Sequence, residues 1–112
     1  MIIIRDNVSS GALTETSLLV LLSLFQELHG YGIKQFIEEN TQGKVVLGMG
    51  TLYGAINNLE KKGWIVESSR EGNRINYIIT DLGIQQVENE EKRLKSLISL
   101  VSKIKEDKNE KD

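Results

Sequence analysis

The stretch Gly50-Thr51-Leu52-Tyr53, followed by Leu59 and then by Gly63-Trp64-Ile65, decides the fold of this chain. Apolar residues recur at positions 52, 56 and 59, whereas threonine precedes them and tyrosine and asparagine stand between them. This spacing predicts a helix over about residues 50–62 with one apolar face and one polar face. Such a helix can present its polar face to a DNA groove while its apolar face holds the domain together.

Two strand-like runs follow this helix. They cover residues 64–70 and 74–80 and flank the short connection Glu71-Gly72-Asn73. Because both runs are rich in β-branched and aromatic residues and the connection contains glycine, they predict a β-hairpin. Thr80 then stands where it can cap a last helix.

Two further helices are predicted before residue 50. The first is capped by Thr14 or Thr16 and runs to about His29. Apolar residues cover most of its circumference, which predicts burial in the core or between subunits. Residues 30–32 predict a turn, and the second helix then ends near residues 41–43.

Three helices followed by a hairpin make the winged helix-turn-helix plan, in which the hairpin is the wing. The predicted fold class is mainly α with a small β-hairpin, namely a winged helix-turn-helix domain plus a C-terminal dimerisation helix. We expect a flexible N-terminal arm over residues 1–13 and the winged helix-turn-helix domain over residues 14–80. A dimerisation helix over residues 81–104 and a disordered charged tail over residues 105–112 complete the predicted chain.

The predicted last helix carries an apolar stripe. Val87, Leu94 and Val101 recur every seven residues, and other aliphatic residues widen the stripe. A domain of this size has no further core to cover such a face, so we expect a second copy of the chain to cover it. The expected dimer interface comprises Leu18, Leu22, Phe25, Val87, Leu94, Leu97, Ile98, Val101 and Ile104. In the alternative interpretation these residues line an apolar ligand cleft between the first and last helices.

Composition and charge restrict the function. The chain has 112 residues, enough for one domain, and no cysteine, which excludes disulfides and thiolate metal sites. No run reaches the roughly 18 apolar residues of a membrane span, so a cytoplasmic location is expected. The net charge is −2, but residues 31–80 carry six basic and five acidic residues. So weakly basic a DNA binder needs two copies or a close shape fit at physiological salt.

Eight polar side chains are candidate DNA contacts. Thr51 and Tyr53 lie at a helix N-terminus, where hydroxyls and backbone amides suit phosphate. The asparagines that follow suit adenine, because a side-chain amide pairs bidentately with that base in the major groove. The full set is Lys34, Thr51, Tyr53, Asn57, Asn58, Lys61, Arg70 and Arg74. The competing interpretation is a solvated surface, and for Tyr53 it is packing against the second helix.

Catalytic and metal chemistry are not expected. His29 is the only histidine, and no second ligand stands at metal-binding spacing from it. Gly48-Met49-Gly50 lacks the third glycine and the lysine-serine pair of a nucleotide-binding loop. No serine sits in a Gly-x-Ser-x-Gly elbow. We therefore expect no enzyme activity, no cofactor and no metal.

The chain resembles the PadR family of bacterial transcription regulators, and within it the short members that end after one dimerisation helix. The resemblance covers residues 14–104. It rests on His29-Gly30-Tyr31-Gly32-Ile33, on Gly50-Thr51-Leu52-Tyr53, on Leu59-Glu60 with Gly63, and on Tyr77 with Thr80 and Gly83. It implies a homodimer on a palindromic operator, usually a repressor, that a small hydrophobic or phenolic effector releases.

The chain departs from the family pattern at three places. It contains no proline, and Gly48-Met49 stands where the family usually has Ser-Pro. Its wing has Asn73-Arg74-Ile75 in place of a run of basic residues. Leu94 stands where drug-binding members carry a tryptophan, so no particular ligand is implied. The alternatives are a winged helix that binds protein and a small-molecule sensor with little DNA role.

Overall fold

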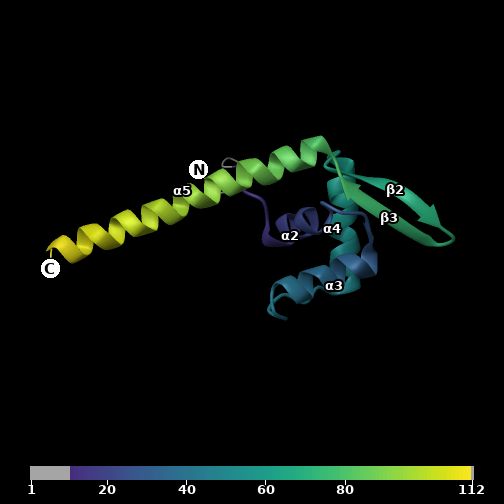
Figure 1. Ribbon diagram of the computed structural model, residues 1–112, viewed down its shortest axis with the longest axis horizontal. Helices are drawn as coiled ribbons and strands as arrows, with labels where there is room; N and C mark the ends of the chain where they lie inside the picture. Colours follow the sequence, from purple (N-terminus) through teal and green to yellow (C-terminus); the bar gives the residue numbers. More distant parts are fainter. Residues whose placement is uncertain (1–10, 112) are drawn as a thin grey trace, which may run out of the picture. The chain divides into compact units, whose positions relative to one another are not determined.

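The computed structural model describes residues 11–111 of the chain (Figure 1). The element order is α2 (Glu15–Ser23), β1 (Leu28–His29), α3 (Gly30–Asn40), α4 (Met49–Lys61), β2 (Ile65–Glu71), β3 (Arg74–Ile79) and α5 (Asp81–Lys111). Residues 13–87 form one compact unit, and α5 from residue 88 onward belongs to a second. None of the helices within residues 11–111 has the length and apolarity to cross a membrane.

One hydrophobic core holds the unit of residues 13–87 together. Leu52, Ile56 and Leu59 of α4 have no exposed surface, which confirms the apolar face predicted from their spacing. The other helices and the sheet add apolar residues from their inner faces. The core consists of Val20, Leu21, Leu24, Ile33, Ile37, Leu47, Leu52, Ile56, Leu59, Ile65, Tyr77 and Ile79.

The first helix is shorter than predicted. Thr14 caps α2, because its hydroxyl accepts a hydrogen bond from the Ser17 amide at 3.1 Å. The helix ends at Ser23, so the predicted end near His29 is wrong. The last residues of the predicted helix instead form β1, which pairs antiparallel with β3. Pairing with a distant strand overrides the local helical spacing here.

Gly30-Tyr31-Gly32 forms the first turn of α3, so the turn predicted between the first two helices is wrong. The helix ends at Asn40, close to the predicted position. Gln42 and Gly43 then adopt positive φ values of 53° and 74°, the left-handed conformation in which helices commonly stop.

The predicted hairpin is present and forms the wing. Sheet order is β1-β3-β2, and β2 and β3 are joined through Gly72, whose φ of 61° provides the tight turn. The register of β2 against β3 shifts between Glu67 and Ser69, which marks a β-bulge. Every residue of β2 after Ile65 is exposed, so the wing extends away from the core.

The last helix begins as predicted but continues further. Thr80 caps it, because its hydroxyl accepts a hydrogen bond from the Gly83 amide at 3.1 Å and donates one to the Gly63 carbonyl at 2.7 Å. The helix runs to Lys111, so its predicted end at residue 104 and the disordered tail are wrong for the described part. Lysine and glutamate extend an existing helix at little cost. Residues 1–10 of the predicted arm lie outside the described residues.

Gly83→Ala is expected to lower the free energy of unfolding by about 1–3 kcal/mol. A Cβ at this position would lie 2.1 Å from the backbone oxygen of Trp64, and no change of rotamer relieves such a contact. Urea denaturation measures the effect. The control is Gly54→Ala within α4, where a Cβ meets open space. Because alanine has a higher helix propensity than glycine, this substitution should raise the free energy of unfolding by about 1 kcal/mol. Equal changes in the two variants would contradict this account of Gly83.

Candidate nucleic-acid interface

The face of α4 opposite the core carries polar side chains and one glycine. Four of the predicted DNA contacts are exposed on α4, namely Thr51, Asn57, Asn58 and Lys61. Gly54 leaves the backbone bare between them, with open space where a side chain would stand. A partner can therefore reach both the helix backbone and the amide side chains, and binding in a DNA groove needs this access.

The N-terminus of α4 has the features of a phosphate contact. Gly48 caps the helix, and no side chain caps the first-turn amides. No acidic residue stands in the first turn. The positive end of the helix dipole and its unpaired amides are thus open to an anion.

Tyr53 packs against the start of α3. A Cβ at Gly30 would lie 2.3 Å from the Tyr53 hydroxyl oxygen, so a side chain larger than glycine would displace the phenol. Tyr53 is nevertheless 43% exposed. The packing interpretation of Tyr53 is therefore confirmed, while its contact with DNA stays a prediction.

A hollow of about 450 Å³ opens beside Tyr53. It combines three phenols and one guanidinium with the N-terminus of α3, which no side chain caps. Its lining residues are His29, Gly30, Tyr31, Tyr53, Asn73, Arg74, Ile75 and Tyr77. Hydroxyl, amide and guanidinium donors around one cavity suit an oxyanion such as a DNA phosphate.

Tyr77 joins this hollow from β3 and is nine-tenths buried. Burial raises the pKa of its phenol, and the carboxylate of Glu60 raises it further. The phenol therefore stays protonated at neutral pH and remains a hydrogen-bond donor. The sequence analysis missed Tyr77 and Tyr31 as site residues, although both stand in the blocks that carry the family resemblance.

The two wing arginines differ in their surroundings. The guanidinium of Arg70 donates hydrogen bonds to both carboxylate oxygens of Glu67, at 3.1 and 3.2 Å. Arg74 begins β3 opposite Glu71 and is exposed beside the hollow. Since an exposed ion pair contributes at most about 1 kcal/mol, a phosphate can compete for Arg70.

Lys34 is engaged inside the domain. Its ammonium group hydrogen-bonds the Glu38 carboxylate and, at 3.0 Å, the Leu47 carbonyl. These bonds tie the segment before α4 to α3. The geometry therefore favours a structural role over the predicted DNA contact, because a phosphate would have to replace both partners.

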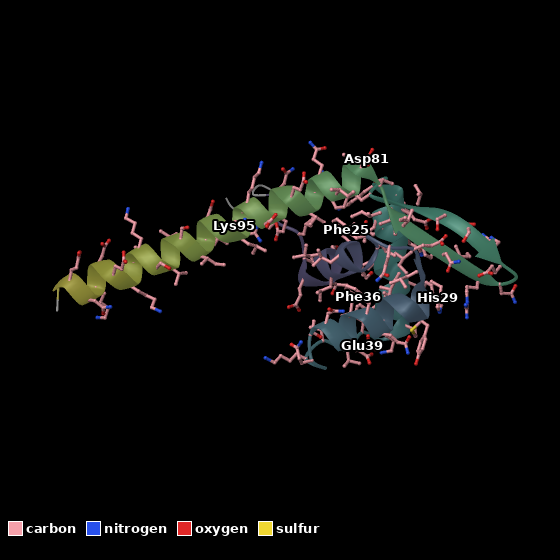
Figure 2. The ribbon with its side chains drawn as sticks, in the orientation of Figure 1. Phe25, His29, Phe36, Glu39, Asp81 and Lys95 are labelled. Carbon is pink, nitrogen blue, oxygen red and sulfur yellow. The ribbon has the colours of Figure 1, made fainter. Side chains whose placement is uncertain are left out.

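The apolar stripe of α5 is exposed along the helix beyond residue 88. Its members are between 37% and 66% exposed, namely Leu94, Leu97, Ile98, Val101 and Ile104. Leu22 and Phe25 are also exposed in their own unit, and Figure 2 labels Phe25 after α2. Two residues of the predicted interface are instead half-buried, namely Leu18 and Val87, and Val87 packs against the core of its own chain.

Glu90 interrupts the stripe in sequence but does not leave an exposed charge. The side chain is buried and accepts hydrogen bonds from the Arg93 guanidinium at 2.8 and 2.6 Å. This pairing raises the pKa of Arg93. The negative charge of Glu90 is thus paired with the positive charge of Arg93 on the same helix.

These elements define a winged helix-turn-helix protein with an open polar helix face beside its wing. The profile of the Transcriptional regulator PadR-like family matches residues 18–89. The chain therefore belongs to this family of transcriptional regulators, which confirms the resemblance seen in its sequence blocks. It is a family of regulators and not of enzymes.

Solved structures share this fold over 79% or more of their own length. A transcriptional regulator from Clostridium thermocellum is 27% identical, with a TM-score of 0.70, over 90% of this chain and 97% of that one. A PadR family regulator from Clostridium difficile R20291 is 21% identical, with a TM-score of 0.68, over 81% and 98%. One from Eggerthella lenta is 24% identical, with a TM-score of 0.67, over 79% of each chain. No protein of curated function shows significant sequence similarity.

Proposed function

We propose that the protein is a sequence-specific DNA-binding regulator in which α4 enters the major groove and the wing contacts the flanking backbone. The observation that carries this proposal is the exposed polar face of α4, which includes Asn57 and Asn58, together with an N-terminus that no side chain caps. Membership of the PadR family supports the same reading. The hollow beside Tyr53 and Arg74 then takes one backbone phosphate.

The proposed DNA-binding form is a homodimer that represses transcription from a palindromic operator. The exposed stripe on α5 supports a two-fold interface, because a coiled-coil-like seam buries such residues against a second copy. Two copies of α4 then read half-sites about 34–36 Å apart on the duplex. Two copies also offset the low positive charge of a single chain.

Release by a small hydrophobic or phenolic effector also belongs to the proposal, on the strength of the family resemblance. An effector between the two subunits would favour a dimer in which the two copies of α4 no longer fit successive major grooves. An operator that accepts several half-site spacings with equal affinity would contradict this mechanism.

Two substitutions separate base reading from backbone contact. We expect Asn57→Ala to reduce the preference for operator over scrambled DNA by about 1–3 kcal/mol, because an amide reads a base edge. We expect Arg74→Ala to weaken binding to both duplexes and to lower the slope of log affinity against log salt by about 1. Fluorescence anisotropy across a salt series measures both.

The control is Lys103→Ala, which removes one exposed positive charge from α5 outside the proposed interface and should change neither quantity. If Asn57→Ala and Arg74→Ala leave DNA binding unchanged, this surface does not bind DNA, and a protein-binding winged helix becomes the better account. Tight ligand binding without an operator footprint would instead favour the small-molecule sensor.

A further inference from the structure

Glu27 connects the segment between α2 and β1 to the wing. Its carboxylate accepts hydrogen bonds from the Ser68 hydroxyl at 2.5 Å and from the Ser69 hydroxyl at 2.8 Å. The Ser69 hydroxyl in turn accepts a hydrogen bond from the side-chain amide of Asn76 at 3.0 Å. One carboxylate therefore holds both strands of the wing, β2 through the serines and β3 through the asparagine.

The β-bulge in β2 makes this arrangement possible. Successive residues of a regular strand point to opposite faces, so two neighbouring serines would not normally reach one carboxylate. Here the register shifts between Glu67 and Ser69, which turns both hydroxyls toward Glu27.

The part of the wing beyond the bulge has little other support. Residues 69–74, which we call the outer wing, are all exposed and contribute nothing to the core. A two-stranded hairpin is only marginally stable by itself. Both wing arginines, Arg70 and Arg74, lie in the outer wing.

We propose that Glu27 is a positioning residue for DNA binding: through Ser68 and Ser69 it fixes the direction of the outer wing and so places Arg70 and Arg74 on the DNA backbone. The inference rests on the proposed function, because it assumes that the wing arginines contact phosphate. Glu27 acts only through the wing, since a carboxylate itself repels phosphate.

The Glu27 carboxyl group is ionised at neutral pH and can therefore accept both serine hydrogen bonds. The hydrogen bonds from Ser68 and Ser69 lower the pKa of its carboxyl group. A carboxyl group with a lowered folded-state pKa contributes stability above its unfolded pKa and loses it as the pH falls through the folded value. The connection therefore weakens only below the ordinary glutamate pKa of 4.5.

The test compares Glu27→Ala with Glu39→Ala, which removes another exposed carboxylate, at the far end of α3 from His29 (Figure 2). Hydrogen exchange of the amides of residues 69–76 reports on the wing without DNA. Glu27→Ala should speed their exchange several-fold, weaken operator binding about fivefold and lower the salt slope by about 1. Loss of a negative charge alone would strengthen binding, so a fall identifies positioning. Glu39→Ala should show none of these effects.

The double variant Ser68→Ala with Ser69→Ala removes the same bonds from the other side and should reproduce all three changes, even if Glu27→Ala folds poorly. In a background that lacks Arg70 and Arg74, these substitutions should no longer affect operator affinity.

The two possible failures are distinguishable. Faster wing exchange with unchanged operator affinity, where loss of the arginines does weaken binding, overturns the inference and leaves the proposed function intact. Unchanged affinity after loss of both arginines overturns the wing's part in the proposed function, and the inference with it.

Discussion

Leu97→Glu together with Val101→Glu is expected to convert the proposed dimer into monomers and to weaken operator binding by at least about 100-fold, because each half-site would have to be bound independently. Both residues are exposed on α5 in the single chain, so neither substitution disturbs the fold of residues 13–87. In the dimer, by contrast, each carboxylate would lose its hydration without a partner. Light scattering gives the mass in solution, and anisotropy gives the operator affinity.

Lys103→Glu is the matched control, because it changes the net charge by the same two units at an exposed position outside the stripe. It should remain dimeric. If the double variant also remained dimeric, the stripe would not be the interface. Monomers that still bound the operator with full affinity would refute the need for two copies.

Leu52→Ala is expected to impair stability and Thr51→Ala to impair DNA binding, although the two residues are neighbours on α4. Leu52 is fully buried, so its truncation should lower the free energy of unfolding by about 2–5 kcal/mol. Thr51 is exposed, so its truncation should change stability by no more than about 0.5 kcal/mol while weakening DNA binding. Urea denaturation and anisotropy on the same samples measure both quantities.

The comparison also tests the assignment of the two faces of α4. A large loss of stability in Thr51→Ala would place Thr51 in a structural role. Unchanged DNA affinity in that variant, at unchanged stability, would remove the first turn of α4 from the proposed interface.

The sequence predicted best what depends on local spacing. Leu52, Ile56 and Leu59 are one helical turn apart, and this alone predicted which face of α4 is buried. Gly72 and its flanking β-rich runs likewise predicted the hairpin. Such features need no knowledge of the rest of the chain.

Features that depend on distant partners were missed. The end of α2 was misplaced because Leu28 pairs with Tyr77, almost half the chain away. The hydrogen bond from the Ser68 hydroxyl to the Glu27 carboxylate depends on a bulge whose position no local pattern reveals. The last helix was predicted to end early for a different reason, because a solvated charged segment has the same composition in a disordered tail and in the extension of a helix.

The candidate site divides along the same line. The exposed residues of α4 follow from its helical periodicity, so Asn57 and Asn58 lie where predicted. Lys34 looked like a free surface cation, but its bond to the Leu47 carbonyl appears only in three dimensions. The hollow was likewise not predictable, because Tyr31 and Tyr77 reach it from separate elements.

The most direct test of the central claim is anisotropy binding of the intact protein to the DNA upstream of its own gene, titrated across salt against a scrambled duplex. The account predicts submicromolar, sequence-selective binding, a steep salt dependence and one dimer per site. Binding to the upstream DNA no tighter than to the scrambled duplex would contradict it.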